Sequence, residues 1–510
     1  MSKLASKGNG RQRSAALNAS SALLQVAVNS ILTFVLTRTI LVRFGSDANG
    51  VNAVATQVVG LLLILEGGLT TATNVALLRP FSERHWSLIL SILNETRRQF
   101  RRLAIVFVAV GALVCYAYSA IVDSSIRREL VFAILFFAVI PQGFAFWYAT
   151  RFRVLFQMEQ REYVLTLVMT CWLGVTQLFA IWCLNAGGPL IVVRLLPLLG
   201  SIAGSLTIGH MARRHFDLLR YHDKAPPYRL EGTRELLSLK IANALYGGMP
   251  LILVTLLPSA GVAVGSVYSV YLSVYTVVKS GVSSVASGAR LGIGSALVER
   301  DPASVRSIFL QYQLLVSAVL SWLTSVATIL VVPFVQIYTR GVTDIHYVDP
   351  LYALLFSAGC YLEVIHQPAG LTILMSGRFR AAKRIQWISV GVLVASLLLG
   401  GFLWGAHGVA AATVATAGVT ALMELGYASK VVVPATGGQT LKVGFLGCSL
   451  VAAAIAIALL QPFVVNSYAE LFVIALGVAT ATGAAVLLLY WLTCRTVVRD
   501  LVRRVARRKG

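Results

Sequence analysis

The chain has 510 residues, of which 57% are hydrophobic and 12% are charged, and its mean hydropathy is +0.78. A water-exposed globular surface normally carries about a quarter of charged residues, so this composition excludes a soluble globular protein and indicates a polytopic membrane protein. The 43 Lys and Arg residues against 20 Asp and Glu residues give a net charge of +23. Membrane proteins concentrate positive charge in their cytoplasmic segments, so this excess predicts no nucleic acid partner.

Apolar runs long enough to cross a membrane recur along the whole chain. A bilayer core about 30 Å thick requires roughly 20 apolar residues in a helix. We identify about fourteen such runs, and each is continuous rather than alternating, which favours helices over barrel strands. They cover approximately residues 16–44, 50–78, 103–122, 129–150, 162–185, 187–210, 239–260, 262–290, 308–334, 350–375, 380–402, 407–430, 440–461 and 468–494. The predicted fold class is therefore all-α, with about 14 transmembrane helices.

The longest polar interruption, residues 211–238, divides the chain into six spans followed by eight. Because transporters are often built from two repeated halves, we predict two six-helix lobes around a central cavity, followed by a C-terminal helix pair. The predicted parts are an N-terminal lobe at 1–215, a cytoplasmic linker at 216–238, a C-terminal lobe at 239–435, and the helix pair with a basic tail at 436–510.

Basic residues predict the orientation in the membrane. Placing both termini in the cytoplasm puts most of the 43 Lys and Arg residues in cytoplasmic segments, as is typical of multi-pass proteins. The basic tail at 495–509 could also contact anionic headgroups of membrane lipids. The inner loop at 79–102 interleaves apolar residues such as Trp86 and Ile89 with charges, which predicts an amphipathic helix lying in the membrane interface.

Polar side chains share one face on each of three predicted spans, counted at about 100° per residue. On the first span the face contains Asn18, Ser21, Gln25, Asn29 and Thr33, and on the second it contains Asn52, Thr56, Glu66, Thr70, Thr73 and Asn74. On the eighth it contains Tyr268, Tyr271, Tyr275, Lys279, Ser283 and Arg290. Aromatic rings offer apolar faces to sugar C–H groups, and Lys and Arg bind phosphate oxygens, so these faces could line a cavity for a carbohydrate phosphate. The alternative is that each face is a hydrogen-bonded contact between helices.

Charged residues inside apolar runs are the strongest candidates for function, because a charge in hydrocarbon costs about 2.5 kcal/mol or more. Lys279 is predicted to face a cavity, with an ion pair to Glu66 as the alternative. Glu363 and His366 share one face of the tenth span, where Pro368 can break the helix. A carboxylate beside an imidazole could couple transport to protons or sodium, or form a core pair.

Arg194 in the sixth span has two open interpretations, since it could serve the transport path or pair with Glu424. The six Cys residues lie in or at the end of spans, without the clustered spacing of a metal site, so we expect no metal ion. We expect no cofactor, and no GxxxxGK[ST] phosphate-binding loop occurs. The short outer loops and the missing pair of carboxylates argue against an enzyme.

Several stretches resemble the Wzx-type lipid-linked oligosaccharide flippases of bacterial polysaccharide export. This branch belongs to the superfamily that also contains the multidrug and toxin extrusion transporters. The resemblance lies in PFVQIYTRGVTDIHYVDPLYALLF (333–356), PAGLTILMSGRFRAAKRIQ (368–386) and GAHGVAAATVAT (405–416). Residues 32–69, LTFVLTRTILVRFGSDANGVNAVATQVVGLLLILEGGL, resemble the first two spans of that family.

The resemblance implies two six-helix lobes in a V and a flippase of the bacterial inner membrane. Its substrate would be an undecaprenyl-diphosphate-linked oligosaccharide, moved to the outer leaflet by alternating access for polysaccharide export. Lys279 and Arg290 would hold the pyrophosphate, and a polysaccharide polymerase and other assembly proteins would be partners. The alternatives are an ion-coupled multidrug antiporter of the same superfamily, an integral-membrane polysaccharide-assembly enzyme, or a scaffold without transport activity.

Overall fold

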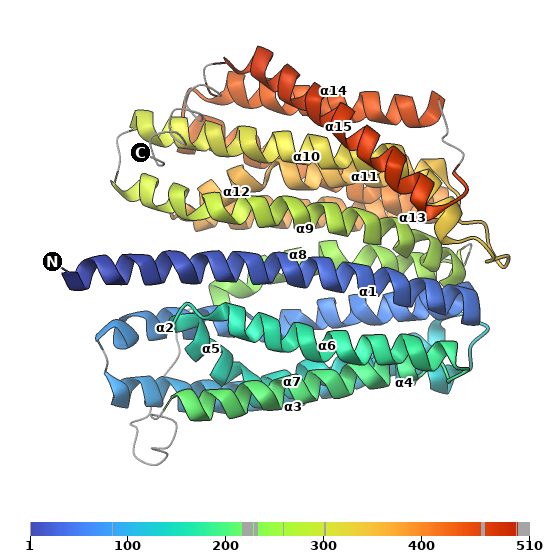
Figure 1. Cartoon of the computed structure of the whole chain (residues 1–510), viewed down its shortest axis with the longest axis horizontal. Coiled ribbons are helices and arrows are strands. Elements are labelled where there is room, and N and C mark those ends of the chain that lie inside the picture. Colours follow the sequence, from blue (N-terminus) through green and yellow to red (C-terminus); the bar gives the residue numbers. More distant parts are fainter. Residues whose placement is uncertain are drawn as a thin grey trace. The chain divides into compact units, whose positions relative to one another are not determined.

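The computed structural model describes most of the chain, and every regular element in the described part is a helix (Figure 1). The described backbone covers residues 2–83, 85–216, 228, 233–258, 260–299, 302–460, 465–495 and 497. Side chains are described there for all but residues 2–13, 15, 16, 82, 233–240, 242, 243 and 284–299. The predicted all-α fold class is confirmed.

The chain forms two compact units, Met1–Ser266 and Val267–Gly510. The predicted seventh span packs with the first unit, because its helix contacts the first helix of the chain. The predicted lobe boundaries stay a prediction, and most of the predicted linker, residues 217–227 and 229–232, lies outside the described residues.

The first unit is a helical bundle in which α1 packs against α4, α6 and α8, while α3 packs against α4 and α6 against α7 (Figure 1). Its elements are α1 Ser2–Leu62, η1 Leu63–Glu66, α2 Leu69–Glu83, α3 Trp86–Ile121, α4 Arg128–Phe144, η2 Ala145–Ala149, α5 Thr150–Met158, α6 Glu162–Asn185, α7 Val192–His215 and α8 Thr233–Leu256. Helices satisfy their own backbone hydrogen bonds, so apolar side chains can face lipid on one side and the bundle on the other.

The second unit is organised around α10, which packs against α11, α14 and α15, while α11 packs against α13. Helix α9, Gly261–Glu299, begins in the first unit and continues into the second. The remaining elements are α10 Pro302–Tyr338, α11 Pro350–Ile365, α12 Gln367–Met375, α13 Phe379–Tyr427, η4 Ala428–Val432, α14 Gly437–Leu460 and α15 Tyr468–Thr493.

Each predicted span corresponds to helical structure. In the described part of the chain, 10 helical segments are long and apolar enough to cross a membrane. Two of these segments each contain two predicted spans, which meet at Gly45 (φ 80°) in α1 and at Gly405 (φ 58°) in α13. Only glycine adopts such positive φ values without strain, so the chain reverses direction there with almost no loop. The protein is therefore a multi-pass membrane protein.

The predicted interfacial helix at residues 79–102 is wrong as a separate element. Residues 79–83 continue α2, and α3 runs without interruption for 36 residues from Trp86 to Ile121. Ile89, one of the apolar residues of the predicted helix, is fully buried in the bundle, as is Ile92 one turn further along α3. The apolar residues of this loop have the same 3.6-residue spacing as a span, so they extend the neighbouring helix instead of lying across it.

The C-terminal pair of helices is attached to α10 through buried hydrogen bonds. The hydroxyls of Ser317 and Tyr490 are 2.6 Å apart, and Thr440 Oγ1 donates to Gln313 Oε1 at 3.1 Å. Trp322 Nε1 donates to a carbonyl of α15 at 2.8 Å. Helices α14 and α15 are thus integral parts of the second unit.

Candidate functional site

A membrane-embedded ion pair joins α9 to α11. Lys279 Nζ lies 2.9 Å from Glu363 Oε2, and the two side chains are 24% and 29% exposed. The pairing offsets the cost of placing each charge among apolar helices, and neither side chain is fully enclosed within the second unit. The cation predicted from sequence therefore has a carboxylate on α11 as its partner.

The three tyrosines that precede Lys279 on α9 are buried in the second unit. The rings of Tyr268, Tyr271 and Tyr275 surround Phe356 of α11, with centroid distances of 4.8, 6.2 and 6.2 Å. Their residue exposures are 2%, 0% and 1%, so no face of these rings is open to a sugar in this structure. Their expected role in lining a cavity stays a prediction; in this structure the partner of the aromatic stripe is a ring on α11.

The tyrosine hydroxyls attach the same two helices to each other. Tyr271 Oη donates to the carbonyl of Tyr347 at 3.1 Å and accepts from the backbone N–H of Asp349 at 2.9 Å. Tyr275 Oη donates to the carbonyl of Ala353 at 3.2 Å. The stripe fixes α9 against α11 along several turns, and this attachment places Lys279 opposite Glu363.

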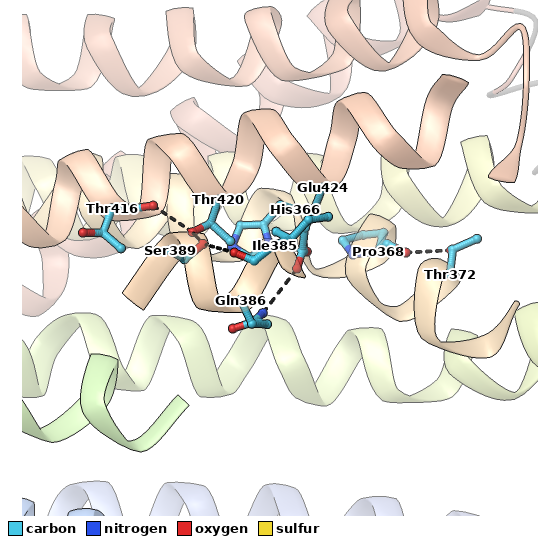
Figure 2. A network of polar contacts seen from close by, with 9 residues as sticks. All are labelled: His366, Pro368, Thr372, Ile385, Gln386, Ser389, Thr416, Thr420 and Glu424. Atoms are coloured by element: carbon cyan, nitrogen blue, oxygen red, sulfur yellow. Dashed lines mark hydrogen bonds and ion pairs between the residues drawn. The ribbon is translucent and has the colours of Figure 1, made fainter. Parts of the chain in front are cut away.

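A second polar cluster lies where α11 ends and α12 begins (Figure 2). His366 Nδ1 lies 2.8 Å from Glu424 Oε2, and Gln386 Nε2 donates to the other oxygen of Glu424 at 3.4 Å. The side chains of His366 and Glu424 are 14% and 8% exposed. Pro368 falls in the first turn of α12, as predicted, and the helix break brings the imidazole to the carboxylate.

Hydroxyl groups continue this cluster between the two halves of α13. Thr420 Oγ1 donates to Ser389 Oγ at 2.7 Å, and Ser389 Oγ donates to the carbonyl of Ile385 at 3.0 Å (Figure 2). A Cβ at Gly370 of α12 would lie 3.0 Å from the carboxyl carbon of Glu424 and closer still to one of its oxygens. The carboxylate of Glu424 is therefore packed closely between α12 and the two halves of α13.

The structure gives Glu363 and His366 different partners. Their side chains were expected to act together on one face, but Glu363 binds Lys279 whereas His366 binds Glu424. Arg194 donates to Thr56 Oγ1 at 2.9 Å and to the carbonyl of Asn52, and its pairing with Glu424, which belongs to the other unit, stays a prediction. Glu424 carries the same sequence signal as Glu363, a carboxylate inside an apolar run, and that signal could have placed it in the site.

Two predicted site residues of the first unit form hydrogen bonds within that unit. Glu66 Oε1 accepts from the backbone N–H of Thr70 at 3.0 Å, at the start of α2. Asn74 Nδ2 donates to Gln157 Oε1 at 3.2 Å. Gln25 and Asn29 are half-buried on α1.

One predicted site residue cannot be placed. The side chain of Arg290 lies outside the described residues, although its backbone belongs to α9.

No family model and no curated protein sequence matches the chain. Among solved structures, an inward-facing multidrug resistance MATE family transporter of the MOP superfamily is similar, with a TM-score of 0.58 at 12% identity, covering 85% of this chain and 98% of the other. A MOP superfamily transporter from Pyrococcus furiosus gives 0.56 at 12% identity, covering 86% and 96%. The lipid II flippase MurJ, in an inward closed conformation, gives 0.61 at 14% identity, covering 94% and 99%. The chain thus has the fold of MOP superfamily transporters.

Proposed function

We propose that this protein is a flippase that moves an undecaprenyl-diphosphate-linked oligosaccharide across the bacterial inner membrane by alternating access, for polysaccharide biosynthesis. The observation that carries the proposal is the Lys279–Glu363 pair, a cation held at membrane depth by a partner that remains partly exposed. A cation is rarely kept at membrane depth without a function, because removing it from water is costly even when it is paired.

The pair can act as an exchangeable anion site. In the empty state Glu363 compensates the charge of Lys279, and an arriving diphosphate replaces the carboxylate as the partner of the ammonium. The ammonium stays compensated during loading, while the carboxylate of Glu363 loses its partner and is neutralised by taking up a proton. A diphosphate carries more than one negative charge, so a second cation is required, and Arg290 on the same helix is the candidate.

The position along the helices agrees with loading from the inner leaflet. At about 1.5 Å per residue, Lys279 lies about 27 Å from the start of α9, and Glu363 lies about 20 Å from the start of α11. With both termini in the cytoplasm, α9 and α11 begin at the outer surface, so the pair would lie in the cytoplasmic half of the bilayer. A lipid-linked precursor made on the cytoplasmic side would present its diphosphate at that depth.

The His366–Glu424 cluster is our candidate for ion coupling. Protonation of the imidazole would strengthen the 2.8 Å contact, whereas protonation of the carboxylate would remove its charge and weaken the contact. Because this contact joins the break between α11 and α12 to α13, its loss would free two helical segments that alternating access must move. Glu363 would take part separately, by accepting a proton once the diphosphate has taken Lys279.

The shared fold supports transport, and one protein of that fold is a lipid flippase by name. A second candidate function, a multidrug antiporter, is favoured by the two membrane-embedded carboxylates Glu363 and Glu424 and by the likeness to the MATE transporter. In that case a cationic drug would take the place of Lys279 at Glu363. The flippase therefore depends on Lys279, whereas the antiporter depends on Glu363.

The experiment uses the full chain in liposomes containing a fluorescent undecaprenyl-diphosphate oligosaccharide whose outer-leaflet fraction is measured with a membrane-impermeant quencher. We expect rapid exchange by the wild type and by the control Thr276→Val, one turn away on the same helix. Lys279→Gln should lose the activity, whereas Glu363→Gln should retain lipid binding. Uptake of a fluorescent cation that survives in Lys279→Gln and disappears in Glu363→Gln would establish the antiporter and refute the flippase.

A further inference from the structure

Four arginines converge at one end of the first unit. Arg97 and Arg101 lie one turn apart on α3, Arg151 begins α5, and Arg213 lies in the last turn of α7. The guanidinium carbons of Arg151 and Arg213 lie 4.5 and 5.9 Å from the centre of the same ring, Phe152. The guanidinium carbon of Arg101 lies 5.1 Å from the ring centre of Trp147, and that of Arg213 lies 5.9 Å from the ring centre of Tyr148, the next residue of η2. The four groups therefore form a concentrated positive charge.

The acidic side chains nearby are committed to other groups. Glu95 pairs with Arg98 at 2.5 Å, and Glu159 pairs with His215 at 2.9 Å and with Arg161 at 3.6 Å. Within the described part of the chain, none of the four converging arginines forms an ion pair with a carboxylate. Their mutual repulsion is uncompensated by the protein itself, and an anion supplied from outside would relieve it.

Burial is a second reason to expect an acceptor from outside the protein. Arg97, Arg101 and Arg151 are half-buried, and Nε of Arg101 is buried without a hydrogen-bond partner among the described residues. A buried guanidinium N–H without an acceptor is costly, and phosphate oxygens match the planar array of donors that arginine presents. Several arginines around one point are the arrangement that binds a phosphate rather than a single carboxylate.

The surroundings indicate that the phosphate belongs to a lipid. The guanidinium of Arg101 lies 5.1 Å from the ring centre of Trp147, which is 43% exposed. One turn further along α3, the apolar side chains of Ile105 and Val106 are 61% and 48% exposed. Tryptophan and arginine at the edge of an exposed apolar band are typical of the membrane–water interface. A headgroup at the arginines would thus have its acyl chains beside Ile105 and Val106.

We propose that Arg97, Arg101, Arg151 and Arg213 form a phosphate-binding site at the membrane surface that takes the headgroup of an anionic lipid. In the predicted orientation this end of the bundle faces the cytoplasm, where anionic lipids attract basic side chains. The site lies in the first unit and does not involve the Lys279–Glu363 pair, so it stands whether or not the protein is a flippase. The same phosphate chemistry would also accept a soluble phosphate or pyrophosphate.

The test compares two variants that each remove two positive charges from the same end of the unit. Arg97→Gln/Arg151→Gln removes charges of the cluster, whereas Arg102→Gln/Arg214→Gln removes two exposed arginines outside it. The full chain in nonionic detergent is titrated with phosphatidylglycerol, phosphatidylcholine or inorganic pyrophosphate, and the midpoint of thermal unfolding is recorded.

We expect phosphatidylglycerol to raise the midpoint more than phosphatidylcholine does. The difference between the two midpoint shifts should fall by at least half in Arg97→Gln/Arg151→Gln and should be unchanged in the matched control. A shift of full size with pyrophosphate alone would assign the site to a soluble anion, and no shift with pyrophosphate would assign it to the lipid. Equal losses in both double variants would overturn the proposal, because net charge alone would explain them. If the cluster variant does not fold, Arg213→Gln, an exposed position, makes the same comparison against Arg214→Gln.

Discussion

Neutralising the members of the Lys279–Glu363 pair singly and together tests whether they form an energetic unit. Breaking a fully buried ion pair costs about 3–5 kcal/mol, whereas an exposed pair contributes about 0–1 kcal/mol. With side chains 24% and 29% exposed, the pair lies between these limits. We expect Lys279→Gln and Glu363→Gln each to lower the free energy of unfolding by about 2 kcal/mol, because each leaves one charge without its partner.

The double variant Lys279→Gln/Glu363→Gln should recover most of this loss, since neither charge then remains. We expect it to unfold within about 1 kcal/mol of the wild type, with a coupling energy of about 3–4 kcal/mol in a double-mutant cycle. The assay is reversible unfolding in mixed detergent and dodecyl sulfate micelles, with Thr276→Val as a control on the same helix. Strictly additive losses would refute the reasoning. Lipid transport should stay absent in the stable double variant, which separates folding from function.

Two further predictions concern the second unit. A Cβ at Gly447 would lie 2.7 Å from a serine hydroxyl of α10 and closer still to the hydroxyl of Tyr361. Gly447→Ala should therefore destabilise the protein by about 1–3 kcal/mol. Gly444→Ala, whose Cβ would meet nothing within 4 Å, should instead stabilise it by up to about 1 kcal/mol. Equal free energies of unfolding for the two variants would contradict this packing. Asp349 accepts from two backbone N–H groups of α11 at 2.9 and 3.2 Å. Its other oxygen lies 2.6 Å from His407 Nε2, so replacement by Ala should cost about 1–2 kcal/mol in the same assay, more than loss of the cap alone. An equal cost for the exposed Asp123→Ala would exclude these contacts as the cause.

The membrane spans could be predicted from sequence because the bilayer imposes a length and an apolar composition on each helix. What could not be predicted was how spans join. Gly45 and Gly405 look like ordinary loop glycines in the sequence, yet each reverses the chain through a single positive φ. The beginning of α3 was misassigned for a related reason, since an amphipathic pattern does not distinguish a helix on the membrane from one that extends a span.

The charged members of the site were also predictable, because Lys279, Glu363 and His366 each interrupt an apolar run. Their partners were not predictable from one sequence, since Lys279 and Glu363 are 84 positions apart and His366 and Glu424 are 58 apart. The tyrosine stripe on α9 could be interpreted from sequence as a ligand-binding face or as a contact between helices. The position of Phe356 on another helix, which favours the contact, could not be predicted.

The buried polar face of α10 has a consequence for the number of helices that a chain of this kind can have. Gln313, Ser317 and Ser321 are 1%, 0% and 0% exposed. Deleting α14 and α15 would remove the Thr440 donor of Gln313 Oε1 and the Tyr490 hydroxyl beside Ser317, and would turn a polar face toward acyl chains. A twelve-helix version of this protein would therefore favour apolar residues at Gln313 and Ser317, so the composition of α10 indicates that the last two helices pack against it.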